Sequence, residues 1–307
     1  YKGIKGKIIA SRRLKHYSFS KAILFQNAFD AAALVYLSGI KERIGYNRDG
    51  RGFLLTKPVQ INKKIKRLHH ILYYLNLLKE TGVDVNYRHP WIYLSIEERI
   101  KAQNILNSVN RPIILINPGA AYGSAKRWPT KYFAILIEMI IKDLNGSIII
   151  TGSTDEQKIV TEIISKVNLE KISYRQILNL TGKISLREFI SILSQVDIVV
   201  TNDSGPMHLA YAVGTPVVAI FGSTDPNLTG PPSYINLKGK DFPIIYEFNT
   251  EAKILWKKVS CSPCFERECP KGEAICLKKI SAKEVFEEIK QLLPKKKAIF
   301  FDRDGTL

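Results

Sequence analysis

Asp197-Ile198-Val199-Val200-Thr201-Asn202-Asp203-Ser204-Gly205-Pro206-Met207-His208 passes from an apolar run into a short polar turn, and an apolar, helix-like segment follows it. This order predicts a buried strand, a tight turn and the start of a helix. Ser204 suits the N-cap, Pro206 suits the first helical turn, and Gly205 lets the backbone approach a ligand closely. The free amides and the positive end of the helix dipole would favour an anion. The alternative is a helix whose cap is purely structural.

Two ionisable side chains flank this turn. Asp203 adds a hydrogen-bond acceptor, and His208 adds a donor that titrates near neutral pH. Together with the amides, they favour a ligand that carries both sugar hydroxyls and phosphate.

The second half of the chain repeats this strand and helix rhythm from Arg111 onward. Its Ile- and Val-rich runs hardly alternate with polar residues, which predicts strands buried on both faces of a parallel sheet. Amphipathic stretches that predict helices fit between the runs. The predicted strands are 113–117, 147–151, 177–180, 197–201 and 216–221, and the predicted helices are 130–144, 155–167 and 185–195. This half is predicted to be a doubly wound α/β domain.

The first hundred residues show a shorter form of the same pattern, with strands predicted at 22–26 and 42–46 and helices at 28–37 and 67–81. Such a domain normally has more strands, so we expect it to be incomplete. Helices are also predicted at 95–107, between the halves, and at 281–293. The predicted domains are 1–105, 106–293 and a tail of 294–307. Two α/β domains facing each other would enclose a cleft, with ligands at the carboxyl ends of the strands.

Composition favours an anionic partner, because 46 Lys and Arg against 28 Asp and Glu give the 307-residue chain a formal net charge of +18. No nucleic-acid motif accompanies the charge, so we expect no nucleic-acid partner. The bias suits an anionic membrane surface instead. The sequence shows no apolar run near the roughly 20 residues of a membrane span and no secretory leader, which favours a cytoplasmic protein.

Further polar loops follow the predicted strands. Asn117-Pro118-Gly119 leads through small residues to Lys126, whose ammonium can neutralise a diphosphate. The alternative is a surface Lys-Arg pair beside a packed tryptophan. After the next strand, Glu156 can accept hydrogen bonds from a ribose, and after the third, Ile184 can lie against a base. All four loops should leave the same edge of one sheet, and their joint occurrence predicts a nucleotide-sugar site.

These four loops, 117–129, 151–156, 180–186 and 201–208, together resemble the family-nine glycosyltransferases, the bacterial lipopolysaccharide heptosyltransferases. The resemblance runs through residues 20–293. In the first domain, 23–27, 43–46 and 49–52 look like that family's acceptor-side segments.

The resemblance implies a GT-B fold and an inverting transfer of heptose from ADP-heptose to the heptosyl-Kdo-lipid A inner core. It implies no metal or other cofactor for the transfer, a monomer, and peripheral contact with the inner membrane. By the same resemblance, Lys126 stabilises the departing ADP, and Asp203 and His208 hold heptose and phosphate. The implied donor-binding residues are Asn117, Gly119, Ser124, Glu156, Ile184, Ser204, Gly205 and Met207.

One departure from the family's pattern concerns the general base. The family's base is an aspartate in a Gly-Asp turn after the first strand, and residues 1–20 do not contain that turn. Transfer should therefore be impaired unless Asp30 or Asp49 substitutes, and neither lies in the expected strand-end context. Two alternatives stay open: a GT-B-type sugar-nucleotide epimerase, or a non-catalytic fragment that binds nucleotide sugar.

All four cysteines fall within a short segment, as Cys261, Cys264, Cys269 and Cys276. Such thiols can hold a tetrahedral zinc ion, although their spacing is not that of a standard zinc ribbon. Reduced or reversibly paired structural thiols are the equal alternative.

The C-terminal segment combines an apolar run with Asp302-Arg303-Asp304-Gly305-Thr306. It resembles the opening of haloacid-dehalogenase-type phosphatases, in which the first aspartate attacks phosphorus and the second acts as acid and base beside magnesium. A phosphatase domain after Leu307 is therefore expected; a chance match is the alternative.

Overall fold

The computed structural model describes residues 3–168, 176–233, 244–245 and 250–294 and divides into two compact units. The first unit extends to Arg88 and includes Asn227–Thr229 and strand β10 (Ile244–Ile245). The second unit begins at His89, earlier than the boundary predicted at 105 and 106. It begins there because helix α5 (Ile96–Leu106) packs against α8 (Leu186–Leu193) of the second unit.

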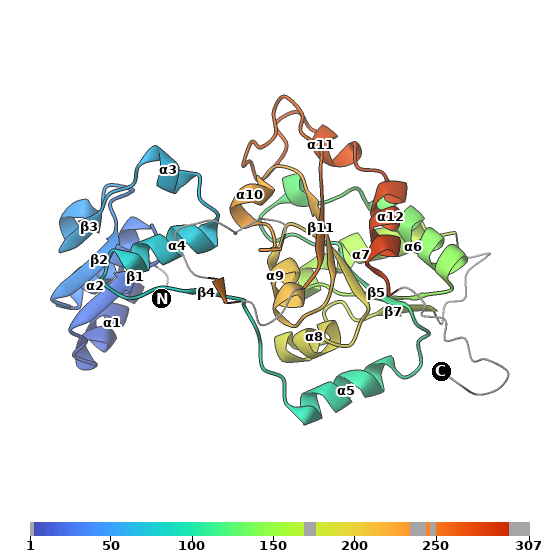
Figure 1. Cartoon of the computed structure of the whole chain (residues 1–307), viewed down its shortest axis with the longest axis horizontal. Helices are drawn as coiled ribbons and strands as arrows, with labels where there is room; N and C mark the ends of the chain where they lie inside the picture. Colours follow the sequence, from blue (N-terminus) through green and yellow to red (C-terminus); the bar gives the residue numbers. More distant parts are fainter. Residues whose placement is uncertain (1–2, 169–175, 234–243, 246–249, 295–307) are drawn as a thin grey trace, which may run out of the picture. The chain divides into compact units, whose positions relative to one another are not determined.

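The second unit is built on a six-stranded sheet in the order β11-β9-β8-β5-β6-β7 (Figure 1). All neighbouring strands are parallel. Every residue of the four strands β5, β6, β8 and β9 is buried, which explains why most of their residues are apolar. The strands are β5 (Ile113–Asn117), β6 (Ser147–Ile150), β7 (Ile177–Asn179), β8 (Ile198–Asn202), β9 (Val217–Phe221) and β11 (Ala252–Trp256).

Helices cover both faces of this sheet. Alternate residues of β5 face opposite ways: Ile114 and Ile116 belong to one apolar cluster, and Ile113 and Leu115 belong to the other. The first cluster lies under α6 (Thr130–Leu144), α7 (Gln157–Ser165) and α12 (Ala282–Leu292). The second lies under α5, α8 and α9 (Gly205–Ala212). Short helices η2 (Ser124–Lys126), η3 (Thr154–Glu156), α10 (Pro226–Thr229) and α11 (Ile275–Lys278) lie in the connections.

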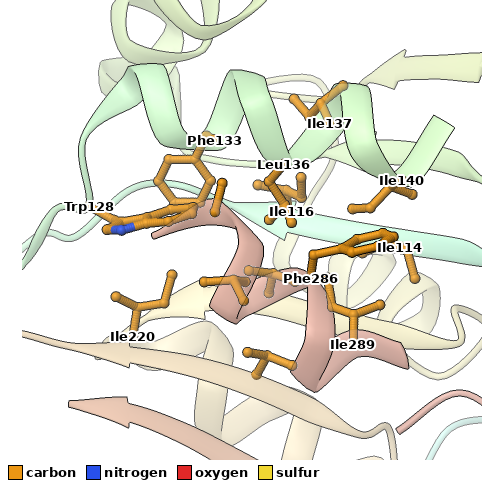
Figure 2. Packing of buried hydrophobic residues seen from close by; sticks show 14 of the residues in the cluster. Ile114, Ile116, Trp128, Phe133, Leu136, Ile137, Ile140, Ile220, Phe286 and Ile289 are labelled. Carbon is orange, nitrogen blue, oxygen red and sulfur yellow. The ribbon is translucent and has the colours of Figure 1, made fainter. Parts of the chain in front are cut away.

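Trp128 and Phe286 join distant segments in the first cluster. Trp128 is 2% exposed, packs edge-on against Phe133, and donates from its indole Nε1 to the carbonyl of Ile280 at 2.9 Å. Figure 2 shows side chains of β5, α6 and α12 meeting in this layer, with Phe286 among them. The C-terminal helix therefore completes the core of the second unit.

The first unit contains a parallel sheet in the order β1-β2-β3, and β4 pairs in parallel with β10. Helix α1 packs against α2. The elements are α1 (Gly3–His16), β1 (Lys21–Leu24), α2 (Phe29–Leu37), β2 (Glu42–Tyr46), η1 (Gly52–Leu54), β3 (Lys57–Val59), α3 (Lys63–Lys66), α4 (His70–Lys79) and β4 (Tyr87–Arg88). The predicted strands and helices of this region are present, whereas α1, β3, α3 and β4 were not predicted.

Arg51 links two strand ends of the first unit. It is completely buried, and its guanidinium donates to the carbonyls of Tyr46, Gln26 and Ala28. Burial lowers the pKa of this guanidinium. The side chain thus holds the carboxyl ends of β1 and β2 together through backbone acceptors.

In the part of the chain that the structure describes, no helix combines the length and the apolar character that crossing a membrane requires.

The packing of α12 can be tested by truncating Phe286. Because Phe286 is 3% exposed, Phe286→Ala should lower the free energy of unfolding by about 3–5 kcal/mol. Ile135→Ala is the control, since Ile135 is 43% exposed on α6 and should change it by no more than about 0.5 kcal/mol. Urea titration measures both, and equal effects would contradict the packing described for α12.

Candidate functional site

The strand order of the second unit reverses beside β5, because β6 and β7 lie on one side of it and β8, β9 and β11 on the other. The loops that follow β5 and β8 therefore leave neighbouring strands in diverging directions. Ligands of open α/β sheets bind at such a switch point. The loops predicted from the sequence, 117–129 and 201–208, meet there.

The buried side-chain amide of Asn202 joins these two loops. Its Nδ2 donates to the carbonyls of Pro118 at 2.7 Å and Gly119 at 3.2 Å, and its Oδ1 accepts from the backbone N–H of Trp128 at 3.0 Å. Asn202 is completely buried, so water does not compete for these bonds. One side chain thus fixes both ends of the loop that carries Lys126.

Lys126 and Asp203 form an ion pair in this region. Lys126 Nζ lies 2.5 Å from Asp203 Oδ2, and the side chains are only 13% and 5% exposed. The hydroxyl of Thr224 donates to the same carboxylate oxygen at 2.6 Å. The sequence predicted separate contacts for Lys126 and Asp203, and the structure instead brings the two together. Thr224 was not predicted, although it follows β9 in a polar turn of the same kind.

A pocket of about 470 Å³ opens between the strand-end loops of the second unit. Apolar side chains such as Leu186 and Phe189 form part of its wall beside polar backbone. It is large enough for a nucleoside, since small-ligand pockets span about 300–1,000 Å³. Six predicted donor-binding residues line it: Asn117, Gly119, Glu156, Ile184, Ser204 and Gly205.

Glu156 has a structural bond in addition to its place in the pocket. Its carboxylate accepts from the backbone N–H of Ser153 at 2.7 Å in a capping box. The carboxylate also lies directly against Gly119, where a Cβ would come within 1.6 Å of Glu156 Oε1. Gly119 is therefore needed for close packing of two loops, and Glu156 is already held in place.

Ser204 occupies the N-cap of α9 but does not cap it. Its hydroxyl contacts that of Thr201 at 3.1 Å and donates to the carbonyl of Asn202, and no side-chain capping bond forms. The predicted capping by Ser204 is therefore wrong, because local acceptors in the turn take its hydroxyl. A Cβ at Gly205 would meet no atom within 4 Å, so space is open above the start of α9.

Five predicted site residues do not line the pocket: Lys126 and Asp203, which form the ion pair, and Ser124, Met207 and His208. The side chain of Met207 is fully buried and belongs to the core cluster beneath α9. His208 is exposed on the first turns of α9, and Ser124 is exposed at the start of η2.

The cysteine-containing segment 261–276 supports the Lys126 loop from outside. The carbonyl of Arg267 accepts from the backbone N–H of Ala125 at 3.0 Å, and the hydroxyl of Tyr122 donates to the carbonyl of Phe265 at 2.6 Å. Gly123 is pressed against the same Arg267 carbonyl, where a Cβ would come within 2.1 Å. The ring of Tyr122 also lies 4.8 Å from Lys126 Nζ.

The four cysteines line one cavity of about 30 Å³, room for about a single water molecule. All four are free thiols. Among the described residues, no three His, Cys, Asp or Glu side chains are placed to hold a metal ion.

The remaining acidic candidates lie in the first unit or outside the described residues. Asp30 pairs with Lys7 at 2.6 Å and Asp49 with Arg48 at 3.4 Å, both at the surface. Asp302 and Asp304 of the phosphatase-like segment lie outside the described residues.

Comparison with known proteins gives a consistent result. A family model for glycosyltransferase family 9 (heptosyltransferase) matches residues 9–275. Lipooligosaccharide heptosyltransferase 2 of Campylobacter jejuni is 26% identical over 300 residues, which cover 94% of this chain and 82% of that protein. Lipopolysaccharide heptosyltransferase 2 of Escherichia coli K12 is 30% identical over 240 residues, covering 76% of this chain and 67% of that protein.

Solved structures show the same fold. The structure of E. coli ADP-heptose lps heptosyltransferase II matches with a TM-score of 0.74 at 24% identity, over 94% of this chain and 81% of that chain. A family 9 glycosyl transferase from Veillonella parvula matches with a TM-score of 0.71 at 20% identity, over 95% and 80%. These matches confirm the predicted GT-B class of α/β fold with parallel sheets.

The environment of the thiols predicts an order of alkylation. Burial raises the pKa of the Cys276 thiol and shields its sulfur from reagents, whereas Cys261 is exposed. In the native protein at pH 8, iodoacetamide should modify Cys261 first and Cys276 last, as followed by peptide mass spectrometry. The urea-unfolded protein is the control, in which the four rates should converge. Rapid modification of native Cys276 would contradict its burial.

Proposed function

The chain belongs to glycosyltransferase family 9, the heptosyltransferase family, and from that premise we propose how its site works. It is a glycosyltransferase that transfers heptose in the synthesis of the lipopolysaccharide core. We propose more specifically a heptosyltransferase of type II, which moves heptose from ADP-heptose to a heptosyl-Kdo-lipid A acceptor and inverts the anomeric carbon. The observation that carries this proposal is the meeting of four strand-end loops around one pocket, two of which also carry the Lys126 and Asp203 ion pair. The family match favours a transferase over the epimerase considered from the sequence.

We expect ADP-heptose to lie in the pocket in a single orientation. The adenosine lies between the loops after β6 and β7, with Ile184 and Phe189 providing apolar surface for the base. The diphosphate lies over Gly205, where space is open and the dipole of α9 favours negative charge. Lys126 is held at the neighbouring loop by its bond to Asp203.

The reaction breaks the bond between the heptose anomeric carbon and the diphosphate oxygen. The acceptor hydroxyl oxygen forms the new bond from the opposite face, and its proton passes to a base. Negative charge develops on the departing ADP, where Lys126 and the amides at the start of α9 stabilise it. Prepositioned donors of this kind usually contribute more to catalysis than any other single effect. The proposed step uses no metal ion.

Asp203 acts as a positioning residue in this scheme. Its carboxylate oxygen already accepts from both Lys126 and Thr224, and the side chain is 5% exposed. It therefore holds the ammonium at the site.

The formal net charge of +18 supports work at the anionic cytoplasmic face of the inner membrane.

Removal of the Lys126 ammonium tests its role. Lys126→Ala should lower kcat by on the order of 100-fold or more, because the departing diphosphate loses a fixed cation. Lys131→Ala is the matched control, since Lys131 is an exposed lysine on the nearby helix α6, and it should leave kcat unchanged. Release of ADP in the presence of acceptor measures both. Equal rates for wild type and Lys126→Ala, both above the rate without enzyme, would refute the assignment.

The space above Gly205 provides an independent test with ADP alone. Gly205→Ala should leave the thermal midpoint within a few degrees of wild type, since its Cβ meets no atom within 4 Å. It should weaken ADP binding by about tenfold or more, because the methyl group occupies the space assigned to phosphate. Ser165→Ala, at an exposed site on α7, is the control. Gly214→Ala is not suitable, because Gly214 has a φ of +88°, which disfavours any side chain. Unchanged calorimetric affinity of Gly205→Ala for ADP would remove the diphosphate from this position.

A further inference from the structure

The cysteine-containing segment also bonds to the loop that follows β9. The hydroxyl of Ser262 donates to the carbonyl of Gly222 at 2.7 Å, and the backbone N–H of Phe265 donates to the carbonyl of Ser223 at 2.8 Å. The next residue of that loop is Thr224, whose hydroxyl bonds the carboxylate of the ion pair. The segment is therefore anchored next to the residue that holds this carboxylate.

Other bonds of the same segment reach the Lys126 loop. The carbonyl of Phe265 accepts from the hydroxyl of Tyr122 at 2.6 Å, and the carbonyl of Arg267 accepts from the N–H of Ala125 at 3.0 Å. Phe265 thus bonds one loop through its N–H and the other loop through its carbonyl. Both sides of the ion pair are therefore held in place by the same few residues.

Two thiols lie directly beside these bonding residues. Cys261 and Cys264 flank the pair Ser262 and Pro263, and Cys264 directly precedes Phe265. Phe265 has a φ of +60°, which is uncommon for a residue with a side chain, so its conformation depends on the bonds at its N–H and carbonyl. A change of position at Cys264 would therefore displace Phe265.

Cys261 and Cys264 are suited to reversible oxidation. Cys261 is exposed and Cys264 is partly exposed, so a small oxidant can reach them. Two residues separate them, which is the spacing of the Cys-x-x-Cys motif of thiol–disulfide chemistry. Both line the same cavity of about 30 Å³. Disulfides in a reducing compartment are usually transient and catalytic or redox-sensing, which suits such a pair.

The other two thiols are less suited to this chemistry. Cys276 is buried, and burial raises the pKa of its thiol. The thiol of Cys269 donates to the carbonyl of Glu273 at 3.2 Å. Oxidation should therefore begin at the exposed Cys261.

We propose that Cys261 and Cys264 form a redox-sensitive site, at which a hydroperoxide closes a disulfide that displaces Phe265 and loosens the support of the ion pair. The Cys261 thiolate attacks one peroxide oxygen, the O–O bond breaks, and the other oxygen leaves as water or an alcohol after taking up a proton. Cys261 is then a sulfenic acid. The Cys264 sulfur attacks the Cys261 sulfur, and the hydroxyl group leaves as water with the proton of the Cys264 thiol. The peroxide is reduced, the two thiols are oxidised, and a dithiol reductant reverses the change by exchange.

Mass spectrometry tests the disulfide. Trypsin cleaves after Lys258 and Arg267, so one peptide contains both Cys261 and Cys264 and no other cysteine. After treatment with hydrogen peroxide and then iodoacetamide, this peptide should have lost two hydrogen atoms and gained no alkyl group. Dithiothreitol before alkylation should restore both thiols. A disulfide between this peptide and either remaining cysteine would overturn the pairing.

Hydrogen exchange and ADP release measure the consequence of oxidation. Exchange should become faster in the peptides that contain Ala125 and Phe265, because the bonds that protect these amides loosen. The effect on activity rests on the proposed function: kcat should fall by about tenfold or more, because Lys126 is displaced from the departing diphosphate. Dithiothreitol should reverse both changes.

Single substitutions assign the effect to one pair of thiols. Cys261→Ser should keep the activity of reduced wild type and lose the response to peroxide. Cys269→Ser is the matched control, because it makes the same change at the same cavity and keeps the proposed pair, so it should respond as wild type does. Thermal unfolding establishes that both variants are folded; if they are not, the alanine variants at the same positions replace them.

The outcomes distinguish this inference from the proposed function. Absence of the disulfide, or a disulfide that leaves hydrogen exchange or a measurable kcat unchanged, overturns the redox site and leaves the transferase standing. Equal loss of activity in wild type and Cys261→Ser also overturns it, because the oxidation then acts elsewhere. If the disulfide forms and exchange becomes faster, but the reduced protein releases no ADP in the presence of acceptor, the proposed function fails and the redox site remains.

Discussion

The site depends on the buried amide of Asn202, because that side chain is the acceptor for one loop end and the donor for the other. An amide has both capacities, whereas an aspartate at this position would have no N–H for the two carbonyls. The strand β8 fixes Asn202, and Asn202 fixes the loop from Pro118 to Trp128. Lys126 then meets Asp203 on the same turn that follows β8. The packing of the core therefore determines the position of these charged groups through one polar side chain.

Much of the second unit could be predicted from the sequence, since its strands are buried on both faces and its helices have one apolar stripe. Strand 113–117 and helix 130–144 are confirmed with the same limits, and the other predicted elements differ by a few residues at their ends, whereas β11 was not predicted. The loops at the strand ends could also be located. Contacts between loops could not be predicted. The Lys126 and Asp203 pair and the bond from Thr224 depend on the order of the strands in the sheet, and local sequence patterns do not determine that order.

The first unit was less predictable for local reasons. Helix α1 has no acidic residue in its first turn and several exposed isoleucines, so its apolar residues do not mark a buried face. Strand β3 has three residues and contains Pro58, which lacks the N–H of an ordinary strand residue. Within the site, Ser204 had the expected position but the wrong bonding, since its hydroxyl donates to the carbonyl of Asn202 within the turn and does not accept from a helix N–H.

The bonds from Arg267 and Asn202 give the Lys126 loop its shape through contacts within the protein itself. A flexible loop must lose conformational entropy when it closes on a ligand, at roughly 1–2 kcal/mol for each residue whose backbone becomes fixed. Here the backbone N–H groups of Ala125 and Trp128 are bonded to Arg267 and Asn202. The conformational entropy of this loop is therefore lost when the protein folds and not when it binds a ligand. Nucleotide affinity can then reflect the contacts made in the pocket more fully than it would for a mobile loop.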